Sequence, residues 1–166
     1  MPATDFLSAL RALHEAGVDF VVVGGLAAVL NGAPVNTFDL DIVHSRTAEN
    51  IARLLSVIQG MDAIYRMQPS RRLRPNASHL SSPGHHNLLT TFGPLDVLGT
   101  VGRGMGYEDL LPHSLEMEIG GGARVRVLDL QTIVALKEQL GGEKDLAVLP
   151  VPRRTLELKR KGDSTS

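Results

Sequence analysis

The 166-residue sequence contains no cysteine and no tryptophan, and its other aromatic residues are four phenylalanines and two tyrosines. Without cysteine, disulfides, thiol nucleophiles and thiolate metal sites are excluded, so any metal must be held by oxygen or histidine ligands. The few aromatic rings leave little material for stacking unpaired nucleic-acid bases. The net charge of -1 at pH 7 gives no overall attraction to nucleic acid or to an anionic membrane.

Long hydrophobic runs are also missing. No apolar run approaches the roughly 20 residues needed to span a bilayer, and the N-terminus lacks a basic region followed by an apolar core and a cleavage site. These features predict a cytoplasmic protein with no membrane partner. A hydrophobic fraction of 43% with 21% charged residues is typical of a globular protein. The length suits one domain, which we assign to residues 1–161, with 162–166 as a frayed tail.

Helical and strand-like hydrophobic patterns alternate along the chain. Apolar spacing and capping residues predict helices at 5–16, 26–32, 46–58 and 129–140, the first and last capped by Asp5 and Asp129. Runs rich in β-branched residues predict strands at 18–23, 37–43, 63–67, 88–92 and 95–98, and a hairpin at 115–119 and 124–128. Gly93-Pro94 is predicted to be the turn between two of these strands. The order predicts an α+β fold close to the α/β class, a mixed β-sheet flanked by helices in a single domain.

Two acidic side chains alternate with apolar residues in the predicted strand 37–43. Side chains at i and i+2 leave the same face of a strand, so Asp39 and Asp41 are expected to project together while Leu40 and Ile42 face the core. Two carboxylates held this close require a cation. The alternative is that both are solvated residues on an exposed strand face, where carboxylates are common. The motifs around the pair favour the metal site.

Two glycines, Gly24 and Gly25, stand between the predicted strand 18–23 and the predicted helix 26–32. Backbone N–H groups at such a turn can cradle phosphate, because no side chain obstructs them. The alternative is that the glycines only permit a sharp turn or close helix packing. The pattern is neither the GxGxxG dinucleotide fingerprint nor the Walker A motif. Phosphate binding is therefore inferred from the motifs nearby.

A third acid, Asp96, lies between apolar residues in the predicted strand 95–98. If this strand lies beside strand 37–43, its carboxylate reaches the same cation as the aspartate pair. The alternative is that Asp96 faces solvent.

Two further groups of polar residues have a functional and a structural interpretation. Arg71, Arg72 and Arg74 form either an anionic-ligand patch, for a triphosphate or an RNA backbone, or a solvated loop. His85 and His86 suit metal binding or proton transfer. Adjacent residues on a strand point to opposite sides, however, so joint ligation by this pair is poor geometry. The structural interpretation is favoured for both groups.

Several short motifs follow one another over about residues 18–149: Gly24-Gly25-Leu26-Ala27, Asn31-Gly32, Thr37-x-Asp39-Leu40-Asp41, Val127-Leu128-Asp129-Leu130 before a helix with Lys137, and Lys144-Asp145-Leu146. Together with Asp96, their order closely resembles the nucleotidyltransferase superfamily, which has the polymerase β-like minimal nucleotidyltransferase fold. Within it, the motifs look most like the minimal bacterial group that includes AbiEii-type toxins.

The resemblance implies a metal-dependent transfer of a nucleoside monophosphate from an NTP to an acceptor hydroxyl, with release of pyrophosphate. Asp39 and Asp41 would hold Mg²⁺ or Mn²⁺ with the triphosphate, because magnesium commonly bridges protein carboxylates and phosphates. Asp96 would help hold a second metal or deprotonate the acceptor. The implied nucleotide-binding residues are Gly24, Gly25, Thr37 and Lys137.

The acceptor and the catalytic competence have alternatives. Acceptors in the superfamily include tRNA, protein hydroxyls and small molecules, and no motif here selects among them. The AbiEii-like group often carries basic residues where this chain has Val35 and Phe38, and an arginine where it has Gly142. These differences favour the alternative of a catalytically weak or inactive nucleotide-binding or protein-interaction module, with a cognate antitoxin or another partner protein. A metal-dependent phosphohydrolase is a third interpretation.

Overall fold

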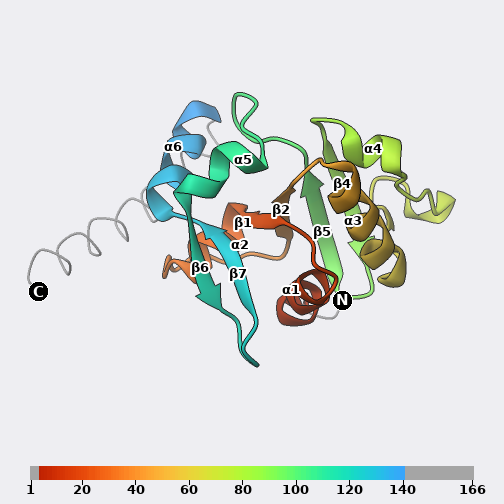
Figure 1. Ribbon diagram of the computed structural model, residues 1–166, viewed down its shortest axis with the longest axis horizontal. Coiled ribbons are helices and arrows are strands. Elements are labelled where there is room, and N and C mark those ends of the chain that lie inside the picture. The colour runs from red at the N-terminus through yellow and green to blue at the C-terminus, as the bar shows by residue number, and fades with distance from the viewer. Residues whose placement is uncertain (1–3, 141–166) are drawn as a thin grey trace, which may run out of the picture.

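A seven-stranded mixed sheet carries the fold in the computed structural model, which describes residues 4–140 (Figure 1). The helices are α1 (Phe6–Glu15), α2 (Gly24–Leu30), α3 (Ala48–Gly60), α4 (Ala77–Ser81), α5 (Tyr107–Leu110) and α6 (Leu130–Leu140), with short 3-10 helices η1 (Pro69–Arg71) and η2 (Leu111–His113). The strands are β1 (Phe20–Val23), β2 (Leu40–His44), β3 (Ile64–Tyr65), β4 (His85–Thr90), β5 (Gly93–Leu98), β6 (Ser114–Glu118) and β7 (Arg124–Leu128). The predicted α+β class with a mixed sheet is confirmed.

The strand order is β3-β4-β5-β2-β1-β7-β6. β1 runs parallel to β7, and β2 runs parallel to β5, whereas the other neighbours are antiparallel. β1 is buried along its whole length because it lies inside the sheet, which explains its uninterrupted Phe-Val-Val-Val sequence. The strands that bear the predicted acids therefore lie near the middle of the sheet.

Helices cover both faces of the sheet. α4 contacts β3 and β4 through the side chains of His79, Tyr65 and His86, and α3 packs beside α4. On the opposite face, the start of α2 lies against the side chain of Asp41, and α6 packs beside α2. Within residues 4–140, no helix is long and apolar enough to cross a membrane. The face with α2 and α6 is the one that carries the predicted site.

The hairpin between β4 and β5 turns at a different place from the predicted one. Gly93-Pro94 belongs to β5, and the turn is formed by Thr91 and Phe92. The Thr90 hydroxyl accepts a hydrogen bond from the Phe92 N–H at 3.1 Å and donates one to the Gly93 carbonyl at 2.8 Å. A threonine side chain thus supplies the turn that was assigned to Gly-Pro.

The segment before β4 also differs from the expected loop, because residues Ala77–Ser81 form α4. Asn76 caps this helix by accepting a hydrogen bond from the His79 N–H, and the His79 ring in turn accepts one from the Asn76 N–H. This reciprocal cap uses histidine in place of the usual glutamate or glutamine. The predicted helices 5–16 and 129–140 do begin after their predicted caps, Asp5 and Asp129. The predicted tail at 162–166 lies outside the described residues.

A buried asparagine ties α3 to the ends of β1 and β2. Asn50 is fully buried and caps three backbone groups, accepting from the Asp19 N–H at 2.7 Å and donating to the carbonyls of Asp19 at 3.1 Å and Ser45 at 2.8 Å. Each of these backbone groups would be costly to leave unpaired away from water.

Replacement of Asn50 by alanine is expected to lower the free energy of unfolding by about 2 kcal/mol, because the Asp19 N–H loses its partner and the carbonyls of Asp19 and Ser45 each lose one of their hydrogen bonds. Chemical denaturation of the pure protein measures the change. The matched control is Glu49→Ala at the exposed neighbouring position, which should alter stability by less than about 0.5 kcal/mol. Equal effects of the two substitutions would contradict the role assigned to Asn50.

Candidate functional site

The parallel pairing of β2 with β5 brings two of the predicted acids side by side. Asp41 and Asp96 are direct partners in the register, so both side chains leave the same face of the sheet. The adjacent strand predicted for Asp96 is therefore confirmed. Asp96 is nearly buried, with 13% of its side chain exposed.

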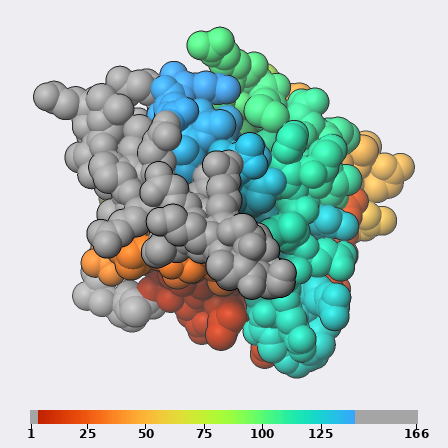
Figure 2. Space-filling view, turned by 90° about the vertical axis from the view of Figure 1, so that its left-hand side faces the viewer, coloured from red at the N-terminus to blue at the C-terminus, as the bar shows by residue number. Residues whose placement is uncertain are grey.

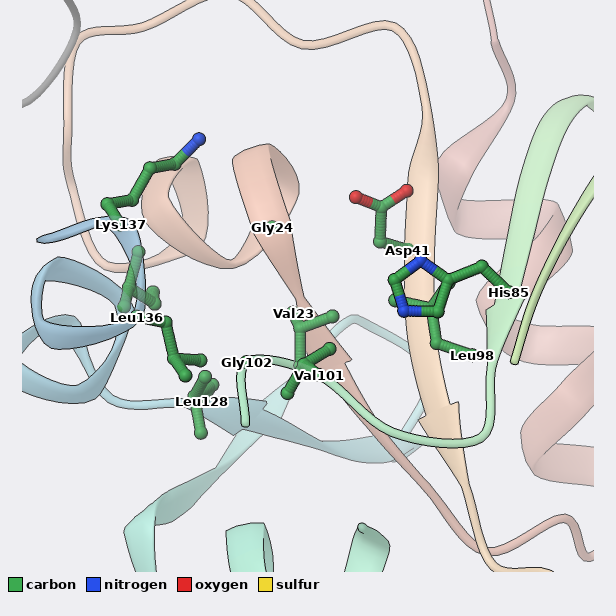
Figure 3. Close-up of a pocket in the computed structure, with 11 residues that line it drawn as sticks. Val23, Gly24, Asp41, His85, Leu98, Val101, Gly102, Leu128, Leu136 and Lys137 are labelled. Carbon is green, nitrogen blue, oxygen red and sulfur yellow. The ribbon is translucent and has the colours of Figure 1, made fainter. Parts of the chain in front are cut away.

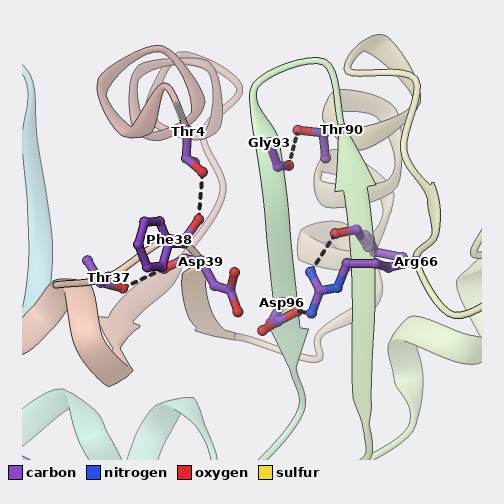
Figure 4. Close-up of polar contacts among 9 residues, drawn as sticks. Thr4, Thr37, Phe38, Asp39, Arg66, Thr90, Gly93 and Asp96 are labelled. Atoms are coloured by element: carbon purple, nitrogen blue, oxygen red, sulfur yellow. Dashed lines mark hydrogen bonds and ion pairs between the residues drawn. The ribbon is translucent and has the colours of Figure 1, made fainter. Parts of the chain in front are cut away.

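Asp39 reaches the site by a different route from the predicted one. β2 begins at Leu40, so Asp39 belongs to the preceding segment, and strand alternation does not align it with Asp41. This segment is held from outside the strand, because the Thr4 hydroxyl donates to the Phe38 carbonyl at 2.6 Å and the Thr37 hydroxyl donates to the Asp39 carbonyl at 3.3 Å. Figure 4 shows the Asp39 and Asp96 side chains pointing toward one another. Asp39 therefore lies close to the other acids, as expected, but the loop before β2 positions it and not the strand.

Asp41 is the most perturbed group of the site. Burial raises the pKa of Asp41 to about 8, and the neighbouring carboxylates of Asp96 and Asp39 act in the same direction, while the Arg66 guanidinium opposes them. One oxygen of Asp41, Oδ1, is buried and has no hydrogen-bond partner among the described residues. A half-buried carboxylate with one buried, unpaired oxygen beside two further acids is a site where a cation is favourable.

The two glycines lie directly against the site. Gly24 has φ of +68°, in the left-handed region, and a Cβ there would overlap the Asp41 carboxylate. A Cβ on Gly25 would lie 2.8 Å from the Thr37 hydroxyl. The predicted turn before residue 26 is corrected, because α2 starts at Gly24 itself. The glycines allow the backbone to approach both site residues closely.

A pocket of about 260 Å³ joins this corner of the sheet to α6 (Figure 3). Asp41 and Lys137 lie on opposite sides of it, with Gly24 between them. His85 also lines the pocket, and its Nε2 lies 2.9 Å from the Thr100 carbonyl. The remaining wall is apolar and consists of Val23, Leu98, Val101, Leu128, Ile133 and Leu136, with Gly102. Lys137 and the glycines, predicted from distant parts of the sequence, therefore share one pocket with Asp41.

Arg66 was not predicted as a site residue. Its guanidinium donates to Asp96 Oδ1 at 2.9 Å and to the Leu88 carbonyl at 3.0 Å (Figure 4). The only sequence signal was a single arginine at the end of the predicted strand 63–67. β3 is shorter than that strand, and Arg66 follows it, pairing its N–H with the Asn87 carbonyl. Arg66 thus neutralises the acid that was expected to be the third metal ligand.

The donor set fits a divalent cation only in part. Asp39 and Asp41 offer carboxylate oxygens, the ligands that magnesium prefers, and Asp41 Oδ1 is unpaired. Within the part of the chain that the structure describes, however, no three histidine, aspartate or glutamate side chains are gathered closely enough to hold a metal. Asp96 is engaged by Arg66. The residues present therefore suit a cation that takes its remaining ligands from phosphate and water.

The other polar groups lie apart from this site. Arg72 and Arg74 pair with Asp62, and Arg71 donates to the Gln68 side chain at 3.1 Å. These contacts are those of an exposed loop. His86 points to the opposite face of the sheet from His85, in agreement with strand alternation.

The raised pKa of Asp41 predicts a pH-dependent stability. The folded state holds the Asp41 proton up to about pH 8, whereas the unfolded chain releases it near pH 4. Between these values the folded state binds more protons, so this carboxyl makes the free energy of unfolding fall as the pH rises. Asp41→Asn lacks this slope and is expected to be more stable than the native protein by at least about 1 kcal/mol at pH 9.

Denaturation curves of both proteins at pH 4 to 9 measure this difference. The matched control is Asp62→Asn, because hydrogen bonds from Arg74 and Arg72 lower the pKa of exposed Asp62. Its removal should give no gain in stability at high pH. A difference between native protein and Asp41→Asn that is independent of pH would contradict the assignment.

Comparison with known proteins gives a result only at the level of structure. No family model matches the sequence, and no curated protein matches it. The fold is similar to the crystal structure of a protein of Thermotoga maritima named a "putative nucleotidyltransferase", with a TM-score of 0.56 and 19% sequence identity. The match covers 98% of this chain and 94% of that chain. The chain therefore has the α+β fold of this nucleotidyltransferase-like neighbour.

Proposed function

We propose that the protein is a metal-dependent nucleotidyltransferase. It would transfer a nucleoside monophosphate from an NTP to an acceptor hydroxyl and release pyrophosphate. The observation that carries the proposal is Asp41, a half-buried carboxylate whose Oδ1 is buried and unpaired, held against Gly24 in a pocket that also contains Lys137. The shared fold and the order of the sequence motifs support the same reaction.

Asp39 and Asp41 are the residues that would hold Mg²⁺ or Mn²⁺. When bound, such a cation neutralises phosphate charge and orients the triphosphate for in-line displacement. Asp41 must lose its proton to bind, since a carboxylate ligand is ionised. The surrounding acids make the protonated form stable without a cation. Nucleotide binding and proton release are therefore coupled at this residue.

The nucleotide would enter the pocket between Asp41 and α6. Gly24 and Gly25 leave room for phosphate oxygens beside the backbone, and Thr37 closes the same corner over Gly25. Lys137 would place its ammonium group on the triphosphate from the opposite wall. The apolar wall suits the base and excludes water. These residues bind and orient the donor.

Asp96 is the residue we assign to the acceptor side. Arg66 holds its Oδ1, so the second oxygen is the atom that would take the proton of the acceptor hydroxyl. The hydroxyl oxygen then bonds to the α-phosphorus as the bond to pyrophosphate breaks. The acceptor class, tRNA, protein or small molecule, stays open.

The second candidate is a nucleotide-binding module without turnover. The ion pair of Asp96 with Arg66 favours it, because one oxygen of this acid is already paired with a cationic side chain. A role beside a cognate antitoxin, as in the AbiEii-like group, fits the motifs of the sequence. Nucleotide binding without transfer to any acceptor would identify this alternative.

The double substitution Asp39→Asn with Asp41→Asn is expected to abolish transfer, by more than about a thousandfold, because both proposed cation ligands lose their charge. The measurement is incorporation of label from each of the four α-labelled NTPs, with Mg²⁺, into RNA, protein and small molecules of a cell extract. Calorimetry with NTP and Mg²⁺ follows binding in parallel.

The control for this experiment is Asp62→Asn, which removes an exposed aspartate paired with Arg72 and Arg74 outside the pocket. It should transfer at the native rate. Unchanged transfer in the folded double variant would refute the function. Binding by the native protein without labelling of any fraction would point to the module.

Lys137→Gln tests the opposite wall of the pocket. The loss of its charge is expected to weaken NTP binding about tenfold while nucleoside binding changes little, because the ammonium group is assigned to phosphate. Calorimetry with the NTP and with the matching nucleoside separates the two. The control is Arg53→Gln. Arg53 is an exposed residue of α3, the helix that packs beside α4 on the other side of the sheet. Equal weakening for both ligands would assign Lys137 to the base instead.

A further inference from the structure

A second group of reactive side chains lies on the face of the sheet opposite the proposed active site. His85 lines the pocket with Asp41, and the next residue of β4, His86, points the other way. There it meets Tyr65 of β3, His79 of α4 and Ser82, which directly follows α4. This group has no role in the proposed nucleotide transfer.

Three hydrogen bonds join these four side chains into one chain. Ser82 Oγ lies 3.2 Å from His86 Nε2, His86 Nδ1 lies 3.1 Å from Tyr65 Oη, and Tyr65 Oη lies 3.0 Å from His79 Nδ1. The His79 and His86 rings are stacked, and both meet Tyr65 edge-on. The hydroxyl of the serine is thus linked to a histidine that is itself oriented by a third group.

The protons on these groups determine which group donates and which accepts in each of the three hydrogen bonds. His79 Nδ1 accepts the backbone N–H of Asn76 in the helix cap, so it carries no proton. Tyr65 must therefore donate its single hydroxyl proton to His79. The Tyr65 oxygen then accepts from His86 Nδ1–H, which leaves His86 Nε2 as an unprotonated nitrogen facing Ser82.

The position of His86 favours the neutral ring. Burial lowers the pKa of His86, a hydrogen bond to the backbone of His79 opposes this shift, and the charges of the nearby His79 and His85 act with burial. Ser82 is half-buried, and its hydroxyl also accepts a hydrogen bond from the Gly84 N–H at 3.3 Å, which leaves its proton for His86. Arg46 donates to the carbonyl of the preceding Ser81 at 3.3 Å and places a positive charge beside this segment. A cation beside a serine suits an electrophile with phosphoryl oxygens.

We propose that Ser82 is a nucleophilic serine, with His86 as its general base and Tyr65 and His79 as positioning residues, and that it accepts a phosphoryl group from a donor with a good leaving group. Nucleophile, base and orienting group follow the arrangement of activated serines in general. Ser82 Oγ forms a bond to phosphorus, the leaving group departs with the electron pair of the broken bond, and the serine proton moves to His86 Nε2.

The experiment uses the full chain and a small fluorophosphonate probe, which loses fluoride on reaction. Peptide mapping by mass spectrometry is expected to find the phosphonyl group on Ser82. The neighbouring Ser81 is an internal control, because its hydroxyl donates to the Ala77 carbonyl at 2.8 Å and not to a histidine. No labelling, or equal labelling of Ser81 and Ser82, would overturn the proposal.

Two variants test whether Ser82 reacts because His86 activates it or only because it is accessible to the probe. His86→Gln should slow the labelling of Ser82 at least a hundredfold, and Tyr65→Phe at least fivefold, because the phenol orients the base without touching the probe. The control variant Glu116→Gln should label at the native rate, since exposed Glu116 lies on β6 at the opposite edge of the sheet. Native labelling rates in both His86→Gln and Tyr65→Phe would refute the assigned roles.

Nitrogen NMR of the histidine rings adds a readout that does not depend on reactivity or on the stability of the variants. In the native protein at neutral pH, His86 is expected to show an unprotonated Nε2 and a protonated Nδ1. The Tyr65→Phe protein should lose this fixed preference. The opposite tautomer in the native protein would overturn the proposal even if Ser82 were labelled.

Discussion

The burial of the Asp41 carboxylate against Gly24 is the constraint on which the rest of the site depends. A side chain at residue 24 would overlap this carboxylate, so the start of α2 and the middle of β2 must approach each other through bare backbone. Two acids lie nearby, and the arrangement stabilises the protonated form of Asp41. The unfavourable term is the electrostatic repulsion among these carboxylates, and a bound cation would reduce it.

The other elements of the fold hold this arrangement in place. The register of β2 with β5 fixes Asp96 beside Asp41, and Arg66 reaches Asp96 from beyond β4. On the far side, α6 brings Lys137 to the pocket, and Asn31 at the end of α2 donates to the buried Leu128 carbonyl at 2.9 Å. Each wall of the pocket is therefore anchored to a central strand.

Much of this fold could be predicted from the sequence because its signals are local. The burial of β1 follows from its apolar run, and the caps at Asp5 and Asp129 follow from side chains that satisfy free N–H groups. Two of the errors occurred where polar side chains replaced the usual turn and cap residues. Thr90 made the hairpin turn expected of Gly-Pro, and His79 completed the cap of α4.

The sequence predicted which residues form the candidate site better than it predicted how those residues are arranged. Patterns of acids and glycines identify residues that chemistry requires, and the pocket does bring Gly24, Asp41 and Lys137 together. The pairing of Arg66 with Asp96 was beyond the sequence, since it depends on the register of β4 beside β5 and on where β3 ends. Long-range pairings of this kind leave no periodic pattern in the chain.

The parallel pairing of β1 with β7 also has a consequence for the order of folding. β1 can pair with β2 as soon as both have been made, but its other edge must wait for residues 124–128, about a hundred positions later in the chain. Until then the edge of a strongly apolar strand is uncovered, and α6 has no strand to follow. Asp39, Asp41 and Asp96 all precede Lys137 in the chain, so during synthesis the wall that carries Lys137 is the last part of the pocket to be made. A partly synthesised chain therefore already has the three acids but lacks the lysine opposite them.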